Sequence, residues 1–262
     1  MATVGRTGER FDWPLFLVLW AGALAGILAS VPYLLWLLGH NAKLPRVPLP
    51  LFIANQLLVN GLLIGLVTAL GLRCARPLHL GAPIIEYALA GRSVGPRMRA
   101  IIGPAVLIGA AIAVALTATD LLIFLPRLPR LNQIGPPPAW AGFLGALYGG
   151  IDEELLLRLG VFSIVAWLLW RIDPRPEGPT ALVLWETNVV VAVLFGLGHL
   201  PATMQVLPLT PLVVSRSLVL NGLGSLVFAY QYWRHGLEAA MITHFSTDIV
   251  ANILANILAH IL

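Results

Sequence analysis

The sequence predicts an all-α protein: a polytopic transmembrane helical bundle of about seven spans, or eight if a re-entrant or interfacial helix is counted. Two observations indicate this fold class. The 262 residues are 58% hydrophobic and only 11% charged, with a mean hydropathy of +0.87, whereas soluble domains carry about a quarter charged residues. The apolar segments are also long enough for spans, which need about 20 residues each.

Seven apolar segments follow one another, separated by breaks rich in proline and charge, such as RIDPRPEGPT. The first segment is too long for a signal-peptide core of about 7–15 residues and is predicted to be a span. The mixed region 73–99 predicts an amphipathic helix at the interface. The predicted spans are 14–39, 51–70, 100–125, 141–170, 181–200, 212–233 and 237–262.

The basic residues predict the orientation. With the N-terminus inside, the inner segments hold ten basic residues and the outer segments four, while Arg158 and Arg216 lie within spans. We therefore expect a cytoplasmic N-terminus, and the arginine-rich loops of a plain membrane protein favour a bacterial cell membrane. The inner residues are Arg6, Arg10, Arg73, Arg76, Arg92, Arg97, Arg99, Arg171, Arg175 and Arg234, and the outer ones are Lys43, Arg46, Arg127 and Arg130.

Two classes of partner or site are disfavoured by composition. The pI of about 9.7 comes from scattered loop residues rather than one basic face, so no nucleic-acid surface is expected. The single cysteine, Cys74, excludes an intrachain disulfide and a cysteine-based metal cluster.

The predicted span 141–170 holds three consecutive acids, Asp152, Glu153 and Glu154, followed by Arg158. Four such charges facing lipid would cost on the order of 10 kcal/mol, so they must face a protein interior or a wet cavity. Glu154 and Arg158 are four residues apart and can pair on one helix face. Glu153 is rotated by about 100° from Glu154 and stays freer. A structural ion pair therefore explains Glu154 and Arg158, but neither Glu153 nor Asp152.

Two later spans supply polar partners. His199 lies near the end of the fifth span, and His244 and Asp248 share a face of the last span, which Asn252 and Asn256 continue. An aspartate can fix the tautomer of a nearby imidazole, or both can ligate a metal. A buried carboxylate can act as a general base towards water, and a second histidine with an amide or carboxyl group can stabilise an oxyanion. An ionised Asp248 donates nothing and would act when protonated or through His244.

Three motifs in this order resemble a known family. EELLLR at 153–158, FGLGH at 195–199 and HFSTD at 244–248 are similar to the EExxxR, FxxxH and HxxxN/D motifs of the CAAX protease and bacteriocin-processing (CPBP, abortive-infection) family of intramembrane proteases. That family includes the type II CAAX prenyl endopeptidases. The resemblance covers roughly 142–256. It implies a single membrane domain over 1–262, with motif-free N-terminal spans in 1–139 and a CPBP-like catalytic core in 140–262.

The resemblance implies an endopeptidase in which Glu153 activates water beside His199, while His244 and Asp248 hold the oxyanion or complete a metal site. The cofactor stays open, with Zn²⁺ as the candidate metal. The prenyl endopeptidases have asparagine at the position of Asp248, so a CAAX substrate is less secure. The expected partners are a peptide or protein substrate, prenylated or lipid-associated, and membrane lipid. The implied site comprises Glu153, His199, His244 and Asp248 as catalytic residues or metal ligands, supported by Glu154 and Arg158.

Other classes fit less well. The chain has no HExxH, no GxGD, and no GxSG around Ser225, which disfavours other intramembrane proteases. A proton-coupled transporter would also bury acids and histidines, but paired inverted repeats are lacking. A non-catalytic immunity or scaffold protein of the same family stays open.

The predicted boundaries conflict with the motifs at one point. At about 1.5 Å per residue, His199 would lie about 27 Å from the inner end of its span and His244 about 10 Å from the inner end of its own. The two histidines meet only if the fifth span begins after Trp185 and Glu186, or if a segment is re-entrant or tilted.

Overall fold

A computed structural model describes residues 11–39 and 47–261, and this part of the chain contains helices and no strand. The predicted all-α polytopic bundle is confirmed. The α-helices are α1 (Trp13–Gly39), α2 (Leu49–Ala75), α3 (Pro83–Leu89), α4 (Gly95–Thr119), α5 (Pro129–Ile134), α6 (Ala139–Tyr148), α7 (Ser163–Trp170), α8 (Ala181–Gly198), α9 (Leu200–Thr203), α10 (Pro211–His235) and α11 (Leu237–Ile261). Short 3-10 turns form η1 (Arg76–Leu78) and η3 (Leu125–Arg127), and π-helical turns form η2 (Asp120–Phe124), η4 (Gly149–Glu153) and η5 (Leu155–Phe162).

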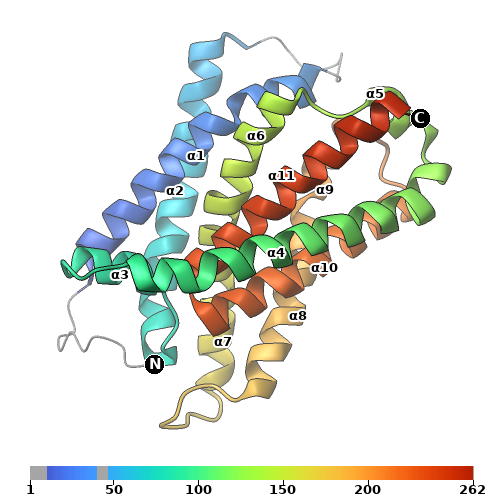
Figure 1. The fold of residues 1–262 in the computed structure, drawn as a ribbon. Helices are drawn as coiled ribbons and strands as arrows, with labels where there is room; N and C mark the ends of the chain where they lie inside the picture. The colour runs from blue at the N-terminus through green and yellow to red at the C-terminus, as the bar shows by residue number, and fades with distance from the viewer. Residues whose placement is uncertain (1–10, 40–46, 262) are drawn as a thin grey trace.

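Within the described residues, six helical stretches are long and apolar enough to cross a membrane. Each corresponds to one predicted span. The remaining predicted span, 141–170, is not among the six. It is present as the continuous run of α6, η4, η5 and α7. The start of α1 and the end of α11 lie at opposite ends of the molecule, as an odd number of crossings requires (Figure 1). The six stretches are Trp13–Gly39, Leu49–Leu78, Gly95–Arg127, Ala181–Thr203, Pro211–His235 and Leu237–Ile261.

The outer surface of the bundle is apolar. On α2, Leu58, Leu62 and Leu66 are each more than half exposed and follow one another at four-residue spacing. Residues at this spacing share one helix face, so α2 presents a continuous leucine stripe outward. Water would not tolerate so large an apolar patch, whereas the acyl chains of a bilayer do. The chain is an integral membrane protein.

Local signals in the sequence fix where two of the long helices begin. Thr180 and Thr210 precede α8 and α10, and their hydroxyl oxygens accept hydrogen bonds from the backbone N–H groups of Val183 and Val213, both at 3.3 Å. Threonine is a favoured N-cap because it satisfies a backbone donor that has no partner within the helix.

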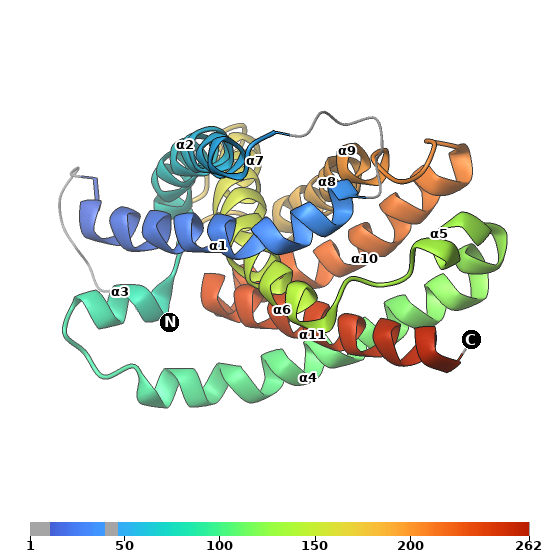
Figure 2. The same cartoon turned by 90° about the horizontal axis from the view of Figure 1, so that it is seen from above.

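The helices fall into two orientations. Seen from above, α2, α7 and α8 are viewed nearly end on, whereas α1, α4, α10 and α11 are viewed from the side (Figure 2). In the first view α11 crosses the middle of the molecule obliquely, and it packs against α4, α6 and α10 (Figure 1). The core holds buried residues of α1, α2, η5, α8, α10 and α11.

This obliquity resolves the conflict between the two histidine depths. Helix α8 begins at Ala181, the predicted start of the fifth span, so the helix itself does not begin after Trp185 and Glu186. Because α8 rises steeply while α11 runs obliquely, the end of α8 meets the early part of α11 (Figure 1). Counting residues along parallel helices overestimated the separation.

A short helix, α3, occupies the region predicted to hold an interfacial helix. The Glu238 carboxylate, in the first turn of α11, accepts hydrogen bonds from the backbone N–H groups of Ile84 and Ile85 at 2.9 and 2.8 Å. These donors belong to the N-terminal turn of α3, where backbone N–H groups have no helical partner. Glu238 therefore fastens α3 to α11. The orientation prediction also counts Arg6, Arg10, Lys43 and Arg46, which lie outside the described residues.

Candidate active site

The EELLLR motif lies where the helix from Ala139 to Trp170 changes its hydrogen-bonding register. The π-helical turns η4 and η5 flank Glu154, between α6 and α7. Such turns are rare and occur frequently at functional sites, because they change the direction in which successive side chains point. Here Glu154 is fully buried, whereas the side chain of Glu153 is 21% exposed. The two neighbouring glutamates thus face different surroundings.

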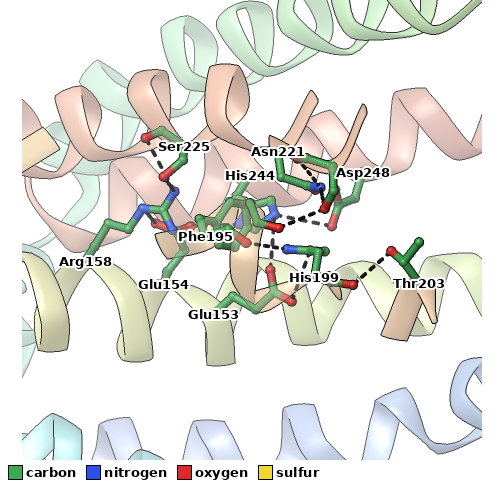
Figure 3. Close-up of polar contacts among 12 residues, drawn as sticks. Glu153, Glu154, Arg158, Phe195, His199, Thr203, Asn221, Ser225, His244 and Asp248 are labelled. Carbon is green, nitrogen blue, oxygen red and sulfur yellow. Dashed lines mark hydrogen bonds and ion pairs between the residues drawn. The ribbon is translucent and has the colours of Figure 1, made fainter. Parts of the chain in front are cut away.

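Glu154 joins two predicted site residues. One carboxylate oxygen, Oε1, lies 2.7 Å from His244 Nδ1 and accepts its hydrogen bond. The other, Oε2, lies 3.3 Å from Arg158 Nε in a fully buried ion pair. The predicted pairing of Glu154 with Arg158 is thus present, and the contact with His244 is an addition that the sequence did not indicate (Figure 3).

Arg158 is held mainly by its ion pair and by cation–π contacts with aromatic rings, and less by hydrogen bonds. Its Nη2 donates to the Ser225 hydroxyl at 3.1 Å, but the pairing of Nε with Glu154 lacks hydrogen-bond geometry. The guanidinium carbon lies 4.8 Å from the ring centre of Phe195 and 5.3 Å from that of Phe228. Cation–π contacts of this kind stabilise a desolvated guanidinium. Arg158 thereby connects η5 to α8 and α10.

Glu153 faces both predicted histidines. Its Oε1 lies 4.0 Å from His199 Nε2, and its Oε2 lies 3.8 Å from His244 Nε2 (Figure 3). The backbone oxygen of Phe195 lies 2.8 Å from His199 Nδ1. A carbonyl oxygen only accepts hydrogen bonds, so this Nδ1 carries a hydrogen and leaves Nε2 turned towards Glu153. Both imidazoles therefore direct Nε2 at one carboxylate.

Asp248 completes the group. Its Oδ2 lies 3.6 Å from His244 Nε2, and its side chain is 35% exposed, like that of His199 at 32%. The four residues predicted as catalytic thus lie together; His244 is buried, and the other three side chains are partly exposed. The face of α11 that they share continues as predicted: Asn252 packs against Gly142 of α6, and Asn256 Nδ2 donates to the backbone oxygen of Pro137 at 3.4 Å.

Glycines of α6 and η4 permit this close approach of α11. A Cβ atom added at Gly149 would lie 3.3 Å from His244 Nε2 and would overlap the Asp248 carboxylate. One added at Gly150 would lie 2.9 Å from the Phe245 side chain. The residues YGG before the motif therefore keep space for the side chains of α11.

Asp152 does not join the group. It is fully buried against Gly26 of α1, and neither of its oxygen atoms makes a hydrogen bond within the part of the chain that the structure describes.

Helix α10 supplies the supporting residues that sequence reasoning missed. The Ser217 hydroxyl donates to the backbone oxygen of Gly196 at 2.8 Å, Asn221 donates to the Ser217 backbone oxygen at 2.9 Å, and Ser225 holds Arg158. These three residues lie four apart on one face of α10. That polar stripe at helical spacing was the available signal.

The four grouped residues do not fit a metal in this arrangement. Tetrahedral zinc with ligands at about 2.1 Å brings neighbouring ligand atoms to about 3.4 Å from one another. The distances from Glu153 and Asp248 to the imidazoles are 3.6 to 4.0 Å. Across 11–39 and 47–261, no group of three or more His, Cys, Asp or Glu side chains is placed to hold a metal ion.

A comparison with known proteins finds a match over the segment that holds the three motifs. Residues 135–250 match a family model, described as type II CAAX prenyl endopeptidase Rce1-like. No curated protein and no solved structure matches the chain. The match includes all three motifs and every residue of the group around Glu153, and it agrees with the CAAX protease family that the three motifs resemble.

Proposed function

We propose that the protein is an intramembrane endopeptidase that hydrolyses a peptide bond with water activated by Glu153 and His199. One observation carries this proposal: a partly exposed carboxylate lies between two imidazole Nε2 atoms, at 4.0 and 3.8 Å, in a protein whose outer surface is apolar. These separations leave room for a water molecule to bridge the groups.

The reaction follows from this placement. Glu153 removes a proton from water while His199 Nε2 orients it, and the water oxygen attacks the carbonyl carbon of the peptide bond. A tetrahedral oxyanion forms. Glu153 then delivers the proton to the amide nitrogen, the C–N bond breaks, and a carboxylic acid and an amine leave. No step needs a metal.

The supporting residues keep His244 in place. Glu154 accepts the Nδ1 hydrogen of His244 and Arg158 holds Glu154, so the imidazole keeps one orientation. A group that holds a catalytic imidazole through its second nitrogen acts in the same way as the aspartate of a serine protease triad.

A cleavage assay on detergent-purified protein tests the proposal. The substrates are a pooled peptide library that includes prenylated CAAX peptides, and Glu153→Gln protein is assayed alongside, with and without a chelator. We expect cleavage by the natural protein in both conditions and none by the variant. Peptides that bind but stay uncleaved by either protein would instead favour a scaffold or immunity role. Loss of activity in chelator would contradict the metal-free mechanism.

A methyl group at Gly149 should disturb the geometry of the site without removing any of its reactive groups. In Gly149→Ala the new Cβ meets Asp248 and His244 Nε2, which forces α11 away from Glu153. Misplacement by about 1 Å can cost a hundredfold in rate, so we expect kcat to fall by 10- to 100-fold. Gly103→Ala on α4 is the matched control, because a Cβ there meets nothing within 4 Å. Equal rates for the two variants would contradict the role given to Gly149.

We further infer that the N-terminus lies in the cytoplasm of a bacterial cell and that the substrate is a membrane-associated peptide or protein. The excess of inner basic residues supports the orientation. In a Cys74→Ser background, a cysteine introduced at Arg175 should react with an impermeant thiol reagent only after the membrane is opened, whereas one at Arg127 should react in intact cells. The reverse pattern would invert the topology.

A further inference from the structure

The group around Glu153 is rich in hydrogen-bond acceptors and poor in donors for the oxyanion. Asp248 stands where an amide side chain would offer an N–H group, and an ionised carboxylate offers none. The Nδ1 hydrogen of His244 is already given to Glu154. Oxyanions in acyl transfer are stabilised by donors aimed at the developing charge, and these contribute strongly to the rate. A hydrogen-bond donor from elsewhere in the fold would therefore stabilise the oxyanion further.

Tyr33 of α1 lies beside this group. Its ring atoms Cγ and Cδ2 are 3.2 and 3.3 Å from the position that a Cβ would take at Gly145. Gly145 precedes Gly149 by four residues, and the corresponding Cβ position at Gly149 is 3.3 Å from His244 Nε2. Residues four apart on a helix lie about one turn, or about 5.4 Å, from each other. The Tyr33 ring is thus roughly one helical turn from the reactive face of His244.

The phenol of Tyr33 has two carboxylates of the site in its surroundings. It lies within electrostatic reach of both Asp248 and Glu153. It makes no hydrogen bond to any residue in the described ranges. A largely enclosed phenol ordinarily finds a hydrogen-bond partner, so a free O–H group beside two site carboxylates points to a partner that arrives with the substrate.

We propose that Tyr33 is a further catalytic residue, whose phenol donates a hydrogen bond to the oxyanion formed on the substrate carbonyl. The inference rests on the proposed peptidase function and deepens it. Tyr33 precedes the segment 135–250 that matches the family. The N-terminal spans would therefore contribute directly to the reaction, rather than only enclosing the motif helices.

Tyr33→Phe removes one oxygen atom and keeps the ring on Gly145. With a peptide that the natural protein cleaves, we expect kcat to fall by about 100- to 1,000-fold and KM to change little, as for loss of one oxyanion donor. Tyr230→Phe is the matched control, because Tyr230 is exposed on α10 and stacks on Trp185 away from the site. Melting temperatures in detergent report whether both variants fold. A Tyr33→Phe protein that folds and keeps kcat within threefold of the natural value overturns the inference.

A second variant separates donation from packing. Asp248→Asn supplies an amide donor beside His244, so in that background Tyr33→Phe should lose much less activity than it does with Asp248 present. Equal losses in both backgrounds would assign Tyr33 to packing and overturn the inference. If the natural protein cleaves nothing, the proposed function falls and this inference falls with it. If the natural protein cleaves a peptide and the Tyr33→Phe variant cleaves it equally well, the proposed function stands and the inference about Tyr33 falls.

Discussion

Glu153→Gln protein is expected to insert and fold normally but to lose peptide cleavage by a factor of about 100 to 10,000, the contribution usual for a general base. Glutamine has the shape of glutamate but cannot take a proton from water. The position tolerates this change structurally, because Glu153 is partly exposed and both of its histidine contacts are long, at 4.0 and 3.8 Å. His199→Ala should lose activity similarly, since His199 orients the same water.

The control is Glu186→Gln, which makes the same chemical change at an exposed position of α8. Its activity should equal that of the natural protein. Circular dichroism and size-exclusion chromatography in detergent establish that each variant is folded. Full cleavage by folded Glu153→Gln protein would show that another group activates the water, and the roles given to Glu153 and His199 would have to be abandoned.

Arg158→Ala is expected primarily to lower the stability of the folded protein, rather than to remove a reactive group. Glu154 and Arg158 are both fully buried, and removing the guanidinium leaves a carboxylate with no cation beside it. Breaking a buried pair in this way costs about 3–5 kcal/mol. The loss includes the hydrogen bond to Ser225 and the stacking on Phe195 and Phe228. Arg158→Lys should recover only part of it, because an ammonium group cannot stack as the planar guanidinium does.

Arg175→Ala provides the comparison. Arg175 pairs with Asp173 at 2.9 Å, but both side chains are more than half exposed, and such surface pairs contribute about 0–1 kcal/mol. Unfolding by denaturant in detergent should therefore separate the two alanine variants by several kcal/mol. Similar unfolding midpoints would mean that water reaches Glu154 and Arg158 and that the network is not sealed from solvent.

Local spacing predicted the parts of the site that lie within one helix. Glu154 and Arg158, and likewise His244 and Asp248, were paired by their four-residue separation, and they lie 3.3 and 3.6 Å apart. The long apolar runs likewise located the spans, since crossing a bilayer needs a fixed length of helix.

Contacts between helices could not be read in the same way. Glu154 and His244 are 90 residues apart, and periodicity reports only which face of each helix is polar, not which faces meet. The π-helical turns change the hydrogen-bond register without changing the apolar pattern, so these turns were not foreseeable, although the spacing alone already separated the directions of Glu153 and Glu154. A tilted segment was one of the alternatives that the depths of the two histidines required, but the sequence could not show that α11 is the tilted one, because it carries length and no tilt.

The dependence of the site on α11 has a consequence for biosynthesis. His244 and Asp248 come from α11, which follows all the other spans in the chain, and Glu154 has no imidazole partner until this helix docks. A nascent or truncated chain that already holds Glu153 and His199 would therefore be inert. Under the proposed function, hydrolytic competence would arise only once α11 has docked against the other helices.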